Sequence, residues 1–122
     1  MSIVLRAFPL SKPVDELRKF VASLEGERKT GTSEFYTRFG VSHESWYLQD
    51  TPTGPWVIAL AIIDNPADAG SRYAVAADEF DSWFKAQVLH LTGIDANVQP
   101  LGPPTTQVFA WSDPDRPNAA LM

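Results

Sequence analysis

The segment from residue 56 to 63 constrains the fold more than any other part of the chain. It reads WVIALAII, so both faces of a strand formed here would be apolar. A strand with one face in water alternates apolar and polar residues, whereas this pattern is typical of a strand that is covered on both faces. The segment at 46–49 is also strand-like, and the turn-forming residues DTPTGP at 50–55 separate the two. The sequence therefore predicts a hairpin whose second strand lies in the interior.

The size and composition of the chain indicate one globular domain. The 122 residues are 44% hydrophobic and 20% charged, and they include no cysteine, which excludes disulfides and thiolate metal sites. A net charge of −5 opposes general binding to nucleic acid, which needs a basic surface. No apolar run approaches the ~20 residues of a membrane helix, and the first residues lack the pattern of a signal peptide. We therefore expect a cytoplasmic protein without nucleic-acid or membrane partners.

The first forty residues predict a strand followed by two helices. Residues 2–9 alternate in the manner of a strand. A helix follows with Ser11 as its cap and Gly26 as its end, because its apolar residues repeat at spacings of three and four. Residues 32–39 predict a short helix that ends at Gly40 in a left-handed conformation.

The residues after the hairpin predict two further helices, one strand and a tail. Asn65 before a proline is a favourable start for an alanine-rich helix. A longer helix begins at Asp78 and ends at Gly93. Residues Thr105–Trp111 alternate like a last strand. Residues 112–122 form a tail, whose last two residues we expect to pack against the domain or a partner subunit.

This order of elements predicts an α+β fold, the ferredoxin-like βαββαβ sandwich, over residues 1–111. The fold has a four-stranded antiparallel sheet with both main helices on one face, and it places the first strand in the middle of the sheet. Two helices cover only one face, yet the strand at 56–63 is apolar on both. We therefore expect a homodimer in which a second copy covers the helix-free face of the sheet.

Four short segments carry a family resemblance: FGVSHESWYLQ at 39–49, TPTG at 51–54, FDSWF at 80–84 and LTGID at 91–95. They resemble short, uncharacterised bacterial proteins of the dimeric α/β-barrel superfamily. The resemblance implies two ferredoxin-like sheets paired face to face as a barrel. That superfamily includes cofactor-free monooxygenases, haem-binding enzymes, cyclases, isomerases and proteins with no known reaction, so the resemblance does not select a function.

The most informative polar residue is Arg6, the only cation inside a core strand pattern. Ile3, Leu5 and Ala7 occupy the other face of its strand and suit packing under helices. Arg6 is then expected to point to the helix-free face, where a dimer would bury it. A buried guanidinium needs polar partners, because an unpaired buried charge is costly.

Three residues are candidate partners of Arg6 by strand alternation: Tyr47 and Gln49 on the hairpin and Gln107 on the last strand. One interpretation is a pocket on the sheet face, formed by these four residues, that binds a small anionic or carbonyl-bearing molecule. The other is a buried polar network at the dimer interface without a ligand, which is the more common origin of such clusters.

The two histidines of the chain, His43 and His90, are far apart in sequence, so we expect no metal site, and the sequence implies no cofactor. His43 lies near the start of the hairpin. It is a candidate general base, since the ordinary pKa of histidine is ~6.5, and it is equally a plain loop histidine. Two classes of function therefore stay open: a small-molecule enzyme or binding protein, and a non-enzymatic structural or interaction dimer.

Overall fold

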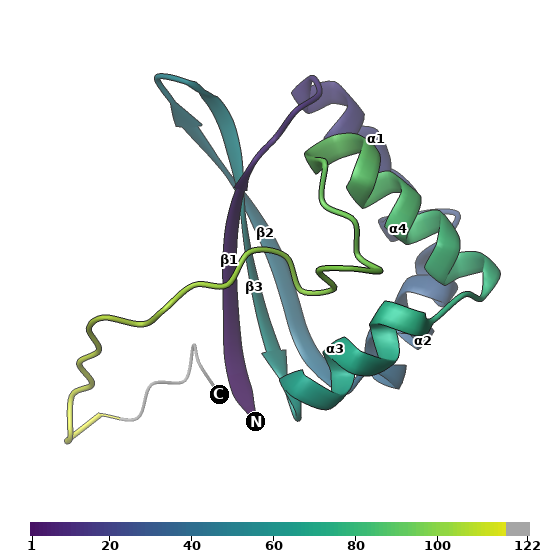
Figure 1. Ribbon diagram of the computed structural model, residues 1–122. Coiled ribbons are helices and arrows are strands. Elements are labelled where there is room, and N and C mark those ends of the chain that lie inside the picture. The colour runs from purple at the N-terminus through teal and green to yellow at the C-terminus, as the bar shows by residue number, and fades with distance from the viewer. Residues whose placement is uncertain (117–122) are drawn as a thin grey trace.

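A computed structural model describes residues 1–116 of the chain. Three strands form one antiparallel sheet, and four helices lie together on one face of it (Figure 1). The strand order is β1-β3-β2, so β3 is the central strand. The elements are β1 (Ser2–Pro9), α1 (Val14–Glu25), α2 (Lys29–Arg38), β2 (Val41–Thr51), β3 (Gly54–Ile63), α3 (Pro66–Val75) and α4 (Glu79–Thr92).

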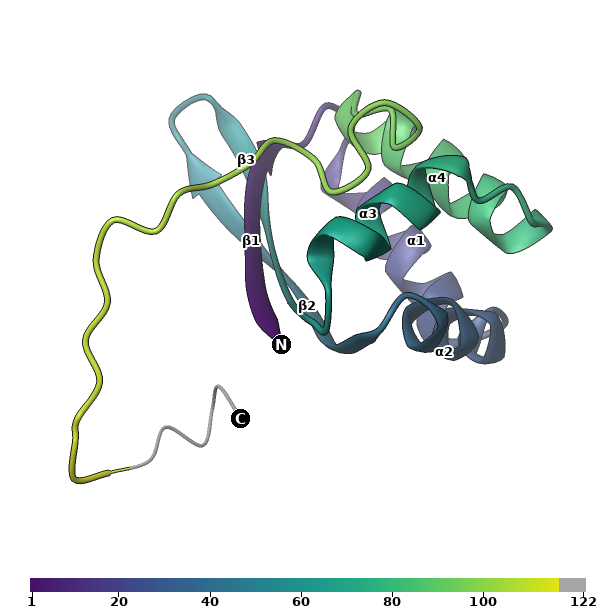
Figure 2. The same ribbon diagram turned by 60° about the horizontal axis from the view of Figure 1, so that its bottom comes forward.

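The predicted ferredoxin-like βαββαβ sandwich, and with it the α/β barrel, is wrong. Residues Thr105–Trp111 are irregular rather than a fourth strand. They follow Gly102, Pro103 and Pro104, and the two prolines have no N–H for a sheet and fixed backbone angles. The chain therefore crosses the edge of β1 and leaves the sheet (Figures 1 and 2). Without a neighbour on that side, β1 is an edge strand and not a central one.

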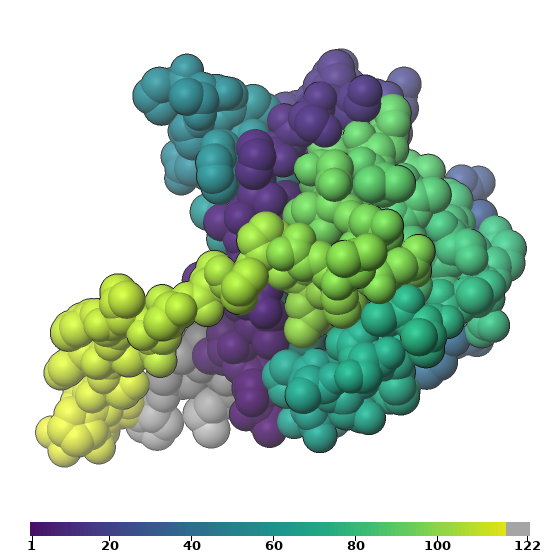
Figure 3. Space-filling view, in the orientation of Figure 1, coloured from purple at the N-terminus to yellow at the C-terminus, as the bar shows by residue number. Residues whose placement is uncertain are grey.

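Residues 103–116, here called the C-terminal arm, extend from the domain on the side of the sheet away from the helices (Figures 1 and 2). In the space-filling view the arm projects from the rest of the molecule (Figure 3). The arm includes the start of the predicted tail. Residues 117–122, with the two terminal residues that we expected to pack, lie outside the described residues.

The strand and helix predictions from local patterns are mostly confirmed. β1 has the predicted bounds, and α1 buries Leu17, Phe20 and Leu24 as one stripe. Gly40 and Gly93 follow α2 and α4 with φ of 72° and 76°, which are left-handed conformations that favour glycine. Two details differ, since α2 begins at Lys29 and β2 at Val41, both earlier than expected.

Helix capping shows where local patterns succeed and fail. The Asn65 side chain accepts a hydrogen bond from the Asp68 amide (3.1 Å), as its cap position predicts. Ser11 does not cap α1. Its hydroxyl donates instead to the Leu91 carbonyl of α4 (2.9 Å), a contact between distant parts of the chain.

The core lies between the sheet and the helices and is rich in aromatic side chains. Phe35 of α2 is its centre, with an exposed fraction of 5%. Its ring contacts five other aromatic rings, with centroid distances from 4.7 to 5.5 Å: Tyr36, Phe39, Tyr73, Phe80 and Phe84. This cluster joins α2, α3 and α4 into one layer above the sheet.

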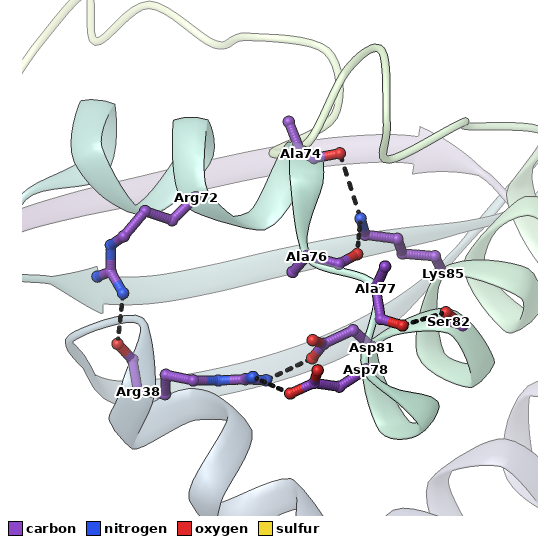
Figure 4. A network of polar contacts seen from close by, with 9 residues as sticks. All are labelled: Arg38, Arg72, Ala74, Ala76, Ala77, Asp78, Asp81, Ser82 and Lys85. Carbon is purple, nitrogen blue, oxygen red and sulfur yellow. Dashed lines mark hydrogen bonds and ion pairs between the residues drawn. The ribbon is translucent and has the colours of Figure 1, made fainter.

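A polar network fastens the same helices together at their ends (Figure 4). Arg38 at the end of α2 binds Asp78 (3.0 Å) and the fully buried Asp81. Lys85 of α4 donates to the carbonyls of Ala74 (3.3 Å) and Ala76 (2.7 Å) and to the Asn97 side chain (2.8 Å). Two of these acceptors are backbone carbonyls at the end of α3, and the other three are side chains, so the network links α2, α3 and α4.

The face of the sheet turned away from the helices is here called the open face. Ile3 and Leu5 are 50% and 42% exposed there, so β1 is oriented opposite to our prediction, with Arg6 toward the helices. The reason is that Val4 and Phe8, on the same side as Arg6, pack into the core. Alternate strand residues make up the open face: Ile3, Leu5, Ala7, Pro9, His43, Ser45, Tyr47, Gln49, Trp56, Ile58, Leu60 and Ile62.

Within residues 1–116, no helix combines the length and the apolar character that crossing a bilayer requires.

Candidate functional site

A cavity of about 160 Å³ lies between the sheet and the helix layer. Its floor is the helix-facing side of the sheet, and its walls come from α2, α3, α4 and the loop at 94–102. An apolar cavity of ~150 Å³ in another protein holds a benzene molecule, so this space fits a molecule of about that size.

The cavity exists because the central strand has small side chains at its middle. Two rows of side chains cross the sheet on this face: Arg6, Ala59 and Trp46 form one row, and Val4, Ala61 and Glu44 the other. Larger residues flank the two alanines on the edge strands, so space is left above β3. On this face the sequence of β3 reads Val57, Ala59, Ala61 and Ile63, and the two small alanines in the middle produce the cavity.

Glu44 is the most unusual residue of this cavity. One carboxylate oxygen, Oε1, accepts a hydrogen bond from the indole N–H of Trp46 (3.0 Å). The other, Oε2, is buried and has no hydrogen-bond partner among the described residues. Burial raises the pKa of Glu44 from 4.5 to about 7, and the Trp46 hydrogen bond opposes part of that rise. Near neutral pH this carboxyl group can therefore either accept or donate a proton.

Two phenols line the same cavity, Tyr36 from α2 and Tyr73 from α3. Burial raises the pKa of both, and the negative charge of Glu44 contributes to each rise. Both tyrosines therefore stay protonated at physiological pH, and their hydroxyl groups are available as hydrogen-bond donors or acceptors.

Arg6 lies across the cavity from Glu44. Its Nε donates to the Leu101 carbonyl (2.9 Å) and its Nη1 to the Leu5 carbonyl (3.1 Å). It forms no ion pair with any carboxylate of residues 1–116, and partial burial lowers its pKa. A guanidinium has further N–H donors beyond these two bonds. The site thus combines a cation on one edge strand with a titratable acid on the other, with β3 between them and the two residues in neighbouring rows.

Glu44 also lies beside a second hollow, a surface groove of about 540 Å³ between β2 and the helices α1 and α2. Four residues line both spaces: Tyr36, Val41, Glu44 and Trp46. These side chains separate the interior cavity from the groove. The carboxyl group is therefore placed to exchange protons with solvent through the groove and with a molecule inside the cavity.

The predicted site residues do not form one cluster. His43 and Tyr47 do meet on the open face, since the hydroxyl of Ser45 contacts His43 Nε2 (3.0 Å) and accepts from the Tyr47 hydroxyl (3.1 Å). Gln49 shares that face but bonds only the Asp50 carbonyl (3.1 Å) among the described residues. Arg6 points to the opposite face, and Gln107 lies on the exposed arm. The predicted pocket on the sheet face is therefore replaced by a cavity on its other side.

The sequence analysis missed Glu44, Tyr36 and Tyr73. A signal for Glu44 was present, because it alternates with Trp46 on the face of β2 opposite to Ser45 and Tyr47. An acidic residue in register with a bulky aromatic one is unusual on a core-facing side. The two tyrosines carried no such signal, since they are ordinary members of amphipathic helices.

A different buried polar cluster does not qualify as a site. Asp81 is fully buried and Lys85 nearly so, but neither lines a cavity described above. Their contacts are to Arg38, to helix-end carbonyls and to Asn97, and these contacts stabilise the packing of the helices. Asp81 Oδ2, like Glu44 Oε2, has no partner among the described residues, but Asp81 lines neither hollow described above. Among residues 1–116 no three histidine, aspartate or glutamate side chains gather in a way that could hold a metal ion.

Comparison of the chain with models of protein families, with curated proteins and with solved structures gives no significant match. The resemblance to dimeric α/β-barrel proteins thus stays a prediction about sequence segments. The function has to be argued from the geometry of the cavity.

Proposed function

We propose that this protein binds a small, mostly apolar carbonyl compound in the cavity between sheet and helices and transfers a proton to or from it through Glu44. The observation that carries the proposal is the buried Oε2 of Glu44, which lacks a partner among residues 1–116 beside an apolar space of about 160 Å³. A buried polar atom without a partner is costly, and a ligand group that forms a hydrogen bond to Oε2 would remove that cost.

The chemistry that suits this arrangement is proton abstraction next to a carbonyl group. The Glu44 carboxylate takes a proton from the carbon beside the carbonyl, the electron pair of the C–H bond forms the C=C bond of the enolate, and the π pair of the C=O bond moves to the oxygen. Arg6 donates hydrogen bonds to the enolate oxygen that develops, because charge-assisted bonds are stronger than neutral ones. Return of a proton to the same carbon regenerates the carbonyl compound and completes the exchange, and no co-reactant is needed.

Two properties of the site support this assignment. A carboxyl group with a pKa of about 7 is ionised in a useful fraction of molecules near neutral pH and is also basic enough to accept a proton. The walls are mainly apolar, which favours a neutral substrate and strengthens the attraction between Arg6 and a developing negative charge. The size of the cavity limits the substrate to about six to eight non-hydrogen atoms, by comparison with benzene.

Exchange of hydrogen for deuterium tests the proposal without knowledge of the natural substrate. Cyclohexanone and other small ketones and aldehydes are incubated with the protein in D₂O, and NMR measures the loss of protons next to the carbonyl. We expect at least one compound to exchange faster with wild type than with Glu44→Gln. Glu25→Gln, which changes a carboxyl group of the same groove wall on α1, is the matched control and should keep the rate.

Arg6→Met tests the contact between Arg6 and the enolate oxygen in the same assay. Loss of the enolate contact should lower the exchange rate at least tenfold, since a hydrogen bond to a charged group contributes ~1.5–3 kcal/mol. No exchange by wild type over the whole panel, together with no thermal shift from any compound, would overturn the proposal. Equal rates for wild type and Glu44→Gln would overturn the role of Glu44.

A further inference from the structure

The C-terminal arm presents large apolar side chains to solvent. Val108, Phe109 and Trp111 are 92%, 81% and 71% exposed. Between residues 106 and 112 the arm makes no hydrogen bond to the rest of the described chain. Isolated exposed apolar residues are normal, but three of them close together in one extended segment are typical of a surface that binds another surface.

The base of the arm is fixed in direction although its middle is not packed. Pro103 and Pro104 restrict the backbone, and the Thr105 hydroxyl donates to the Leu5 carbonyl at the edge of β1. Just before the arm begins, Arg6 Nε donates a hydrogen bond to the Leu101 carbonyl (2.9 Å) and so fixes the chain that leads into the arm. The arm therefore starts from a rigid anchor and points away from its own domain (Figures 1 and 3).

The open face is the second apolar surface of the molecule. It is three strands wide, and Ile3, Leu5 and Tyr47 are 50%, 42% and 54% exposed on it. None of its alternate strand residues carries an Asp, Glu, Lys or Arg side chain, although the chain has 25 such residues (10 basic and 15 acidic). The arm from residue 105 to 111, TTQVFAW, is uncharged as well.

We propose that the arm of one molecule packs across the open face of a second copy of the same chain, so that two molecules exchange arms about a two-fold axis. The arm and the open face belong to the same chain. A two-fold axis therefore forms the arm–face contact twice, and both arms and both open faces are buried in one interface. Neither the open face nor residues 105–111 of the arm has an Asp, Glu, Lys or Arg side chain to desolvate, so two molecules of net charge −5 can meet there without burying like charges. This inference is independent of the chemistry proposed for Glu44, and it specifies how the homodimer expected from the sequence would assemble.

Cross-linking between different variants tests the exchange directly. The chain has no cysteine, so Ala7→Cys on the open face and Ala110→Cys on the arm introduce single thiols. The two variants are mixed, one of them isotope-labelled, and treated with a short bismaleimide. We expect a covalent dimer with one chain of each kind. Ala67→Cys, an exposed position on α3, replaces Ala7→Cys in the control and should give little product.

A double variant with both cysteines in one chain tests the alternative, in which the arm packs against the open face of its own chain. If the arm folded back on its own open face, the Ala7→Cys, Ala110→Cys double variant would close within one chain and run as a monomer. That result, together with no mixed dimer, would overturn the proposal.

Sedimentation of the full chain supplies an independent measurement. We expect wild type to be a dimer at micromolar concentration and the combined Val108→Ser, Phe109→Ser and Trp111→Ser variant to be a monomer with an unchanged circular dichroism spectrum. Val98→Ser alters a residue that is 80% exposed outside the arm and should remain a dimer. A monomeric wild type, or a triple variant that stays fully dimeric, would contradict the arm exchange.

Discussion

The two faces of the central strand β3 are both apolar, yet they have different surroundings. Val57, Ala59, Ala61 and Ile63 face the helices, and Val57 and Ile63 are each only 3% exposed. On the other side, Ile58 and Leu60 are half-buried and Ile62 is buried, while Ile3 and Leu5, which pair with Ile62 and Leu60, are about half exposed. An apolar pattern on a strand face therefore does not indicate which layer, if any, covers that face within one chain. One face is covered by the chain's own helices, and we assign the other to a second copy.

The largest difference between the two faces is expected from truncating one aromatic side chain on each. Phe35→Ala removes the ring at the centre of the helix-side cluster and should lower the free energy of unfolding by ~3–5 kcal/mol. Tyr47→Ala on the open face should cost less than ~1 kcal/mol in the monomer, because the ring is 54% exposed. Denaturant unfolding of both variants checks this, and similar losses would show that the open face is packed within one chain.

Glu44→Gln should raise stability in a pH-dependent way. The folded-state pKa of Glu44 is about 7 and its ordinary value is 4.5, so the folded protein binds the proton more tightly than the unfolded chain does. Stability is therefore lost as pH rises from 4.5 to 7, and the loss amounts to about 3 kcal/mol above that window. The glutamine variant retains the acceptor for Trp46 and has no such loss.

Urea unfolding of wild type and Glu44→Gln at pH 4 and pH 8 measures this effect. The two proteins should have similar stability at the lower pH, and the variant should be the more stable one at the higher pH. Glu25→Gln, at an exposed site, is the control for a general effect of charge. A variant that is less stable than wild type at pH 8 would contradict the burial of Glu44.

Filling the cavity should stabilise the fold and weaken ligand binding. Ala61→Val adds volume where the cavity leaves space, so we expect a gain of ~0.5–2 kcal/mol. Ala96→Val is the matched control, since Ala96 is 2% exposed and does not line the cavity. Overpacking there should cost ~1–3 kcal/mol. A loss of stability in both variants, measured by thermal unfolding, would show that the space above Ala61 is already filled.

The smallest effect is expected for Arg6→Met. The methionine keeps the apolar stem of the side chain, and the main loss is the hydrogen bond from Nε to the Leu101 carbonyl. The two carbonyl contacts of Arg6 are part-buried and exposed, so solvent screens the charge of the donor and the free energy of unfolding should fall by ~1 kcal/mol or less. A loss above ~3 kcal/mol would mean that Arg6 stabilises the fold and is not available mainly for a ligand.

The parts of the fold that depend on local sequence were predictable. The Asn65 cap, the left-handed glycines at 40 and 93, and the strand at 2–9 follow from residues that contact each other within a few positions. Ser11 is the exception that shows the limit. Its hydroxyl satisfies the Leu91 carbonyl, which lies 80 positions away in sequence, and no local pattern encodes that contact.

The errors concern partners that local sequence does not specify. The pattern at 105–111 is that of a strand, but a strand also needs a neighbour, and the preceding prolines direct the chain away from β1. β1 has apolar residues on both sides, so its alternation alone did not decide which side faces the helices. With the wrong side chosen, Arg6 was grouped with Tyr47 and Gln49, and Glu44 was overlooked.

We propose that the helix-facing side of the sheet holds a proton-exchanging carboxyl group, Glu44, beside a small cavity. Carbon-13 NMR of the glutamate side-chain carboxyls, recorded as a pH titration of wild type and Glu44→Gln, tests it most directly. We expect one wild-type signal with a midpoint near pH 7 that is absent from the variant. If every glutamate signal of wild type titrates near the ordinary value of 4.5, the proposed role of Glu44 is contradicted.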